Sequence, residues 1–305
     1  MSQPLNGVAA LPHLGIIRVA GEDAAKFLQG QLTQDFVLLG PNQARLAAFC
    51  TAKGRMQASF IGWQRAPGEI LLTCSRDILA PTLKRLSMFV LRAKAKLTDA
   101  TAEFALFGLT GDALEALPAM PSEPWTKTDV GTAQAIALYP ADSQRRVLWV
   151  APAAERAPAG PALATDLWLW SEVRSGIAAV TAPIVEAFVP QMLNYESVGG
   201  VNFKKGCYPG QEVVARSQFR GTLKRRAFLV HCEVELAAGQ EVFHAADAQQ
   251  PCGTVAQAAA APAGGWDAIV SMQVSAAEQG RLTVASAGGP ELRLLALPYL
   301  LLADV

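Results

Sequence analysis

The sequence has few charged residues and no excess of either sign. Only 17% of its 305 residues are charged, and 26 basic residues balance 26 acidic ones. This balance excludes a globally basic nucleic-acid-binding protein, but it leaves room for a locally basic surface. Half of the residues (51%) are apolar, which is far too many for a disordered chain and enough for two or three packed cores.

Paired metal ligands and a disulfide framework are also lacking. The five cysteines are scattered without any C-x-x-C pair, and only three histidines are present. An odd cysteine count without paired spacing predicts reduced thiols and no metal site. No uncharged run suits a bilayer helix, and no signal peptide is evident at the N-terminus. The sequence therefore predicts a cytoplasmic protein without a membrane partner.

Strand-like and helix-like segments alternate without regular β-α-β order, which predicts an α+β fold. Apolar periodicity indicates strands at 14–20, 46–51, 56–63, 69–74, 103–109 and 145–151, and helices within 75–91 and at 166–175. After Phe219 the texture changes to short strands at 227–234, 240–244, 253–257, 268–274, 281–285 and 292–297. Such closely spaced strands predict a small antiparallel barrel or sandwich, and we expect a loop at 256–265.

The most unusual segment is the run N-F-K-K-G-C-Y-P-G-Q-E-V-V-A-R at 202–216. Glycines and a proline around Cys207 predict a tight turn that exposes the thiol. Cys50, Cys74 and Cys232 lie in apolar runs, so we expect them to be buried. Cys252 lies in a Pro-Cys-Gly turn and is the only rival for a reactive thiol.

Positive charge is concentrated in the same region. Residues 204–226 include one acidic residue, Glu212, and seven basic residues: Lys204, Lys205, Arg216, Arg220, Lys224, Arg225 and Arg226. Nearby cations favour the thiolate, so Cys207 is a candidate reactive sulfur. The same cations suit a polyanion such as a folate tail or RNA phosphates. A solvated basic turn with a chance cysteine is the alternative.

The run K-K-G-C-Y-P-G-Q-E-V-V-A-R, followed by F-R-G-T-L-K-R-R, resembles the signature of YgfZ-type proteins. These are folate-binding relatives of the glycine-cleavage T-protein, an aminomethyltransferase. The resemblance extends to F-L-Q-G-Q-L-T-Q-D at 27–35, A-K-G-R at 52–55, W-x-x-x-x-V-R-S-G from Trp168, and F-V-P-Q-M-L-N at 188–194. It implies two interwoven α+β subdomains around a central folate cavity, which we assign to residues 1–218. It also implies a C-terminal antiparallel β-barrel, which we assign to residues 219–305.

The resemblance further implies a site and a function. Tetrahydrofolate or a derivative would lie in the cavity, and the candidate cofactor-binding residues are Trp168, Glu172, Arg174, Gln191, Asn194 and Arg216. Cys207 would be the catalytic thiol within a motif of Lys205, Gly206, Cys207, Tyr208, Gly210, Gln211 and Glu212. The implied function is to support iron–sulfur cluster assembly or repair and, indirectly, tRNA thiomethylation. The implied partners are folate and iron–sulfur enzymes or assembly factors.

Several alternatives remain beside this interpretation. Trp168 has apolar neighbours at helical spacing, so it also suits a core position. Arg216 is expected either at a strand end facing the pocket or in a surface salt bridge. Aminomethyltransferases carry an acid just beyond the first hairpin turn, where this sequence has Gln57 and Ala58, so a folate-dependent aminomethyl transferase is a weaker alternative. A tRNA-binding module using residues 204–226 is the third alternative.

Overall fold

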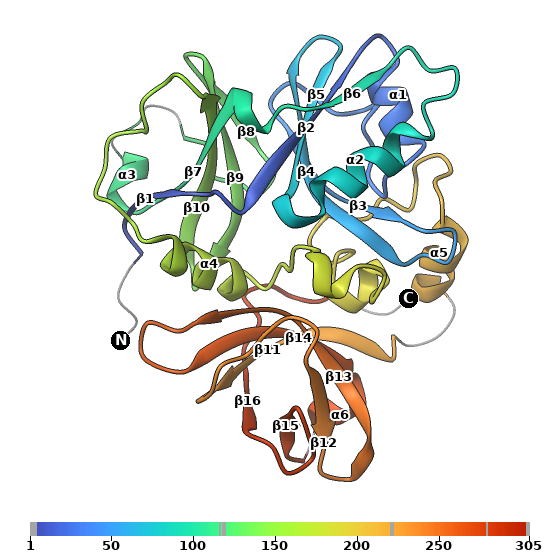
Figure 1. The fold of residues 1–305 in the computed structure, drawn as a ribbon, viewed down its shortest axis with the longest axis vertical. Helices are drawn as coiled ribbons and strands as arrows, with labels where there is room; N and C mark the ends of the chain where they lie inside the picture. The colour runs from blue at the N-terminus through green and yellow to red at the C-terminus, as the bar shows by residue number, and fades with distance from the viewer. Residues whose placement is uncertain (1–4, 116, 118–119, 220–222, 279, 303–305) are drawn as a thin grey trace.

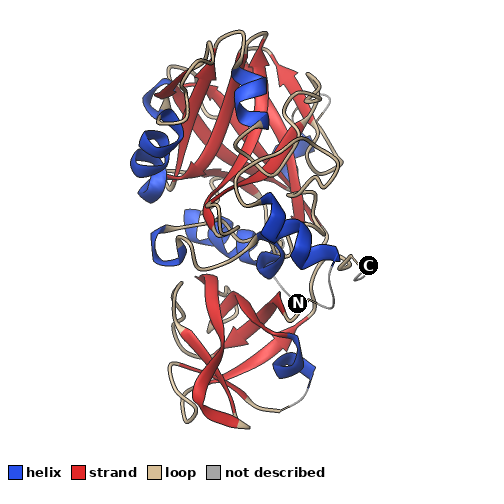
Figure 2. Ribbon diagram, turned by 90° about the vertical axis from the view of Figure 1, so that its right-hand side faces the viewer, coloured by secondary structure: helices blue, strands red, loops and turns tan. Residues whose placement is uncertain are grey.

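In the computed structural model, the described residues are 5–115, 117, 120–219, 223–278 and 280–302. They form two five-stranded antiparallel sheets, a closed barrel, and a layer of helices and turns between the sheets and the barrel (Figures 1 and 2). No helix in this described part of the chain is long and apolar enough to cross a bilayer. The predicted α+β class is confirmed.

One sheet contains most of the N-terminal strands. Its order is β3-β4-β5-β2-β6, with the bounds Ala44–Cys50, Met56–Ala66, Glu69–Ser75, Leu14–Ala20 and Lys96–Asp99. Helix α1 (Ala24–Gln29) follows β2, and helix α2 (Leu79–Ser87) follows β5 after a short 3-10 turn, Arg76–Ile78. Pro81 lies in the first turn of α2, where its missing N–H has no helical partner to lose.

The second sheet has the order β1-β7-β10-β9-β8, with the bounds Gly7–Ala10, Phe104–Thr110, Gln144–Pro152, Ala133–Ala141 and Lys127–Val130. Its first strand comes from the N-terminus and pairs with β7, Gly7 lying opposite Thr110. The chain therefore starts in this sheet, builds the other one, and returns. Short helical pieces flank β7 at Thr101–Glu103 and Asp112–Glu115 (α3). This crossing confirms the interwoven arrangement that the resemblance implies.

Helix α4 (Thr165–Arg174) ends where Gly176 adopts a left-handed conformation, with φ of +70°. The 3-10 turns Ala182–Ile184 and Pro190–Leu193 and helix α5 (Gln211–Phe219) complete the middle layer. We predicted that Arg216 lies either at a strand end or in a surface salt bridge. The prediction of a strand end is wrong, because Arg216 belongs to α5. Val214 and Gln218 are buried at a spacing of four, the period of a helix face.

Six strands close the barrel in the order β11-β14-β13-β12-β15-β16, bounded by Arg225–Cys232, Trp266–Gln273, Asp247–Ala260, Glu241–His244, Leu282–Val284 and Glu291–Leu295. Helix α6 (Val274–Glu278) follows β14. The predicted barrel is confirmed, but the loop expected at 256–265 is wrong over its first half. There β13 continues to Ala260, because Ala258, Ala259 and Ala260 pair with 268, 267 and 266 of β14. The boundary between 218 and 219 falls in the last turn of α5 and stays a prediction.

Candidate functional site

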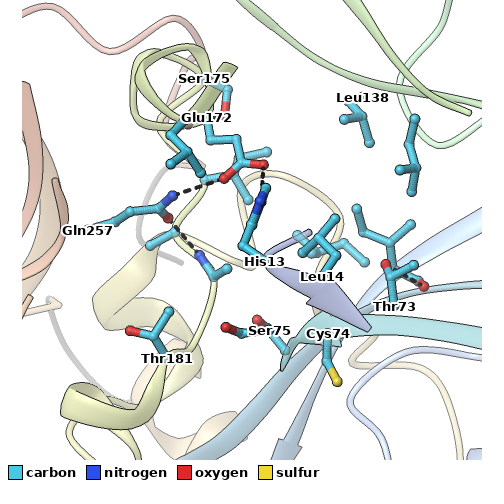
Figure 3. Close-up of a pocket in the computed structure, with 18 of the residues that line it drawn as sticks. His13, Leu14, Thr73, Cys74, Ser75, Leu138, Glu172, Ser175, Thr181 and Gln257 are labelled. Atoms are coloured by element: carbon cyan, nitrogen blue, oxygen red, sulfur yellow. Dashed lines mark hydrogen bonds and ion pairs between the residues drawn. The ribbon is translucent and has the colours of Figure 1, made fainter. Parts of the chain in front are cut away.

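A cavity of about 310 Å³ lies where the two sheets, α4 and the barrel converge (Figure 3). This volume is at the lower end of the roughly 300–1,000 Å³ typical of small-molecule sites. Its wall is largely aromatic and aliphatic. The polar side chains among the lining residues include His13, Ser59, Thr73, Ser75, Tyr139, Arg146, Glu172, Ser175, Thr181, Tyr195 and Gln257.

Glu172, on α4, is the centre of the polar network in this cavity. Its Oε1 accepts hydrogen bonds from His13 Nε2 (3.2 Å) and Trp168 Nε1 (2.9 Å), and its Oε2 accepts one from Gln257 Nε2 (3.3 Å). Figure 3 shows the carboxylate between His13 and Gln257. Burial alone would raise the pKa of Glu172, but the hydrogen bonds and the charge of Arg146 hold it below its usual value. The cavity therefore contains an ionised carboxylate.

Two polar atoms in the cavity wall are buried without a hydrogen-bond partner, His13 Nδ1 and Arg146 Nε. Burial lowers the pKa of Arg146 to about 10, against the opposing effect of Glu172, so its guanidinium remains charged near neutral pH. An unpaired buried polar group in a native structure points to a bound water or ligand. These atoms, together with the carboxylate and the apolar walls, fit a flat, polar-edged organic molecule.

Trp168 lines the cavity but is fully buried. Its indole packs on Gly108, where an added Cβ would lie 2.4 Å from the ring, and the Arg146 guanidinium lies 4.6 Å from a ring centroid. The indole N–H orients Glu172. In this structure Trp168 forms part of the cavity wall and donates a hydrogen bond to Glu172. Its predicted role as a folate-binding residue stays a prediction.

The two arginines predicted as folate contacts lie outside the cavity wall. Arg174 forms an ion pair with Asp142 at 2.6 Å and lies 3.6 Å from Asp267 of the barrel. Arg216 is largely exposed and pairs with Glu212 across one turn of α5 at 2.8 Å. The structure thus places Arg174 between sheet and barrel, and Arg216 in the surface salt bridge that was its alternative.

Gln191 and Asn194 are buried but also do not line the cavity. Gln191 donates to the carbonyl of Val214 and so ties its turn to α5. Asn194, with φ of +57°, accepts from the N–H of Ala227 and donates to the carbonyl of the same residue. Both side chains thus join backbone segments to one another, although Oε1 of Gln191 is buried without a hydrogen-bond partner.

The cysteine motif forms an exposed turn in front of α5. Gly206 and Cys207 are exposed, whereas Lys205 and Tyr208, which flank them, are buried. Gly210 has φ of +82°, and an added Cβ would lie 2.4 Å from the carbonyl oxygen of Thr51. The turn therefore packs directly on the hairpin at 51–55, so the structure joins two segments that carry the resemblance. Gln211 and Glu212 begin α5.

Cys207 is the exposed cysteine of the five, as the turn predicts, and the other four are buried. Burial raises the pKa of Cys50 and of Cys74 to about 12, and it also raises the pKa of the Cys252 thiol. The chemical role of Cys207 stays a prediction. None of the motif residues is among those that line the central cavity.

Four of the six described basic side chains in the segment at 204–226 have hydrogen-bond or ion-pair partners in the fold. Lys205 binds backbone carbonyls, Arg216 pairs with Glu212, Arg225 donates to the carbonyl of Cys252, and Arg226 pairs with Glu196 at 2.7 Å. Arg220 lies outside the described residues. Lys204 and Lys224 are exposed, so a tRNA-binding module in this segment stays a prediction.

Gln57 and Ala58, which stand where aminomethyltransferases carry an acid, also have structural roles. Gln57 donates to Glu186 (2.8 Å) and accepts from Arg85 (3.1 Å), Ala58 is buried, and neither lines the cavity. His13, which carried no sequence signal, lies in the site because its loop crosses α4. Among the described residues no cluster of three or more His, Cys, Asp or Glu is placed to hold a metal ion.

Comparison with known proteins identifies relatives of this chain. No family model matches the sequence. The chain is 31% identical over 235 residues to the tRNA-modifying protein YgfZ of Hamiltonella defensa, covering 72% of this chain and 68% of that protein. It is 31% identical over 233 residues to the YgfZ of Colwellia psychrerythraea, covering 74% and 71%. The chain belongs to the YgfZ family.

A solved structure shows the fold of this YgfZ-family chain independently. The glycine cleavage system aminomethyltransferase T from Bartonella henselae superposes with a TM-score of 0.71, covering 98% of this chain and 87% of that one, at 14% identity. The resemblance found in the sequence and the T-protein fold it implies are both confirmed.

Proposed function

We propose that this YgfZ-family chain binds a reduced folate in its central cavity and supports iron–sulfur enzymes, among them enzymes that modify tRNA. The names of its relatives support the link to tRNA modification. The observation that carries folate binding is the ionised Glu172 at the centre of a largely apolar cavity, in a T-protein fold. The cytoplasmic location stays a prediction.

The residues of the cavity fit tetrahydrofolate in their chemistry. The pterin of tetrahydrofolate has N–H donors along one edge and a carbonyl oxygen beside them, and its pyrimidine ring is flat while its reduced ring is puckered. Glu172 would accept from the donor edge, and the unpaired Nε of Arg146 would donate to the carbonyl. Trp125 and Tyr139, which are partly exposed, would supply apolar and aromatic contact.

The thiol of Cys207 would act outside this cavity. It is exposed on the motif turn, so it is accessible to another macromolecule rather than to a ligand enclosed beside Glu172. We assign Cys207 to contact with a client iron–sulfur enzyme or an assembly factor. The folate site would then control or stabilise the protein that presents the thiol.

Calorimetry with tetrahydrofolate under anaerobic, reducing conditions tests the folate site. Glu172→Gln should weaken binding at least about tenfold, because a charge-assisted acceptor is lost at nearly constant volume. Glu212→Gln, a change in an exposed glutamate that lies outside the cavity wall, should leave the affinity unchanged. Equal affinity of all three proteins, or no binding by the unmodified chain, would exclude the proposed site.

Complementation tests the cellular function. In a cell that lacks its own YgfZ-family protein, activity of a tRNA-modifying iron–sulfur enzyme should be restored by the unmodified chain and by Cys252→Ser. Cys207→Ser should fail, because it removes the exposed sulfur at almost constant volume. Full restoration by Cys207→Ser would remove the thiol from the proposed function.

A further inference from the structure

Lys205, two residues before the exposed cysteine, turns its side chain into the protein. Its relative exposure is 7%, although lysines are almost never buried without partners. The ammonium Nζ donates to the carbonyl of Leu32 at 2.7 Å and also to the carbonyl of Gln29. These carbonyls lie at and just beyond the end of α1, where backbone acceptors lack helical partners.

The same ammonium group lies 4.5 Å from the ring centroid of Tyr208. Tyr208 is itself 6% exposed, so the residues on both sides of Gly206 and Cys207 are anchored in the interior. A Cβ added at Gly206 would meet no atom within 4 Å, so no packing holds this position. The exposed pair therefore lies between two buried flanks, which contact each other.

We propose that Lys205 is a positioning residue, whose ammonium group clamps the end of α1 to Tyr208 and thereby fixes the turn that presents Cys207. The two carbonyls and the aromatic face satisfy the buried charge from different sides. The geometry of the clamp does not depend on the proposed function. Its biological use, to hold the thiol in place for a partner, rests on that function.

The electrostatics of the turn agree with a charged clamp at neutral pH. Burial lowers the pKa of Lys205 to about 8, while Asp35 and Cys207 act in the opposite direction. The amine is therefore mostly protonated at pH 7, with three N–H donors and the positive charge that the Tyr208 ring attracts.

Lys204 provides a matched control in the adjacent position. It carries the same side chain but is exposed, and its backbone N–H donates to Asn202 Oδ1. Removing the Lys204 side chain takes away one cation near Cys207 without touching the clamp. A general loss of local positive charge and a loss of positioning can thus be told apart.

A nitroxide label attached to the native Cys207 reports directly on the turn, because the other cysteines are buried. We expect Lys205→Met to shorten the rotational correlation time of the label about threefold or more, a change from a held to a freely moving segment. Lys204→Met should match the unmodified chain. Lys205→Arg should restore most of the immobilisation, because guanidinium keeps the charge, the donors and the affinity for an aromatic face.

An unchanged spectrum in Lys205→Met would overturn the proposal, as would equal mobility in Lys205→Met and Lys205→Arg. Should Lys205→Met fail to fold, Tyr208→Leu removes the ring contact while it retains the lysine, and it should also mobilise the label. Complementation adds the functional arm, in which Lys205→Met should fail and Lys204→Met should succeed. Success of Lys205→Met beside failure of Cys207→Ser would show that the clamp serves no function. Success of Cys207→Ser would instead remove the thiol from the proposed function and leave the spectra to judge the clamp.

Discussion

The central cavity and the Cys207 turn are built in opposite ways. The cavity draws His13, Glu172 and Gln257 from three parts of the chain, 159 and 85 residues apart along the sequence. The turn takes its anchors and its thiol from four consecutive residues, 205–208. In the cavity the polar groups face one another, whereas in the turn the sulfur faces solvent and the cation is hidden.

This contrast separates two tasks within one protein. A buried, composite site can enclose a ligand and bind its polar edge, because its walls come from several parts of the chain. An exposed turn can offer one atom to a large partner. Gln257 shows that the barrel belongs to the first task, since it donates to Glu172 and accepts from the N–H of Ala179. The barrel thus completes the cavity as one of its walls.

The largest expected effect compares two glutamates, one from each region. Glu172→Leu should lower the free energy of unfolding by about 3 kcal/mol, because it leaves three hydrogen-bond donors and the charge of Arg146 without their buried acceptor. Glu212→Leu removes an exposed carboxylate paired only with Arg216, so its effect should stay within about 0.5 kcal/mol. Urea denaturation measures both. Similar values for the two variants would show that the cavity network contributes no more than a surface pair.

The next effect compares the stability cost of substituting two glycines of the Cys207 turn. Gly210→Ala should cost about 2 kcal/mol, because the position has positive φ and its Cβ would meet the carbonyl of Thr51 at 2.4 Å. Gly206→Ala, also in the motif, meets open space and should be nearly neutral. Thermal unfolding of both variants tests this difference. A neutral Gly210→Ala would mean that the turn does not depend on packing against the hairpin at 51–55.

The same contrast explains what the sequence could predict. The exposed thiol and the glycine turn follow from neighbouring residues, and local sequence chemistry governs tight turns. The barrel follows from short apolar segments separated by turn residues. Arg216 was placed on a strand because Val213, Val214 and Ala215 resemble one, and the helix is decided by tertiary burial of Val214.

The composition of the cavity could not be predicted in this way. His13 precedes β2, Arg146 lies on β10, and Gln257 lies on β13, at the end of the strand predicted at 253–257. No local pattern shows that these three side chains meet α4, because only the crossing of the chain between sheets brings them together. Glu172 was found only through the resemblance, as one of the candidate cofactor-binding residues.

A smaller effect separates the two regions by pH. Lys205 has a pKa of about 8 in the folded chain, against about 10.4 in an unfolded one. Between these values the unfolded chain binds more protons, so stability should rise with pH. We expect the unmodified chain to gain about 1–2 kcal/mol over Lys205→Met between pH 8 and 9.5. Denaturation at each pH measures the difference, and a flat difference would contradict a buried ammonium.

The contribution of the cavity network to stability should change at acidic pH. The pKa of Glu172 is held below its usual value, so its contribution is present above the unfolded pKa of about 4.3 and is lost as pH falls through the folded value. Relative to Glu172→Gln, the unmodified chain should lose stability only in acid. Loss of this difference at pH 8 instead would indicate that the network depends on another group.

The smallest effect is expected for coupling between ligand binding in the cavity and the reactivity of Cys207 on the turn. If folate occupies the cavity, alkylation of Cys207 by iodoacetamide should change by less than about twofold, because no motif residue lines the cavity and preformed sites move little on binding. The rate is measured by mass spectrometry with and without saturating tetrahydrofolate, and Glu172→Gln serves as the control that binds weakly. Strong protection in the unmodified chain alone would show that the ligand reaches or moves the turn.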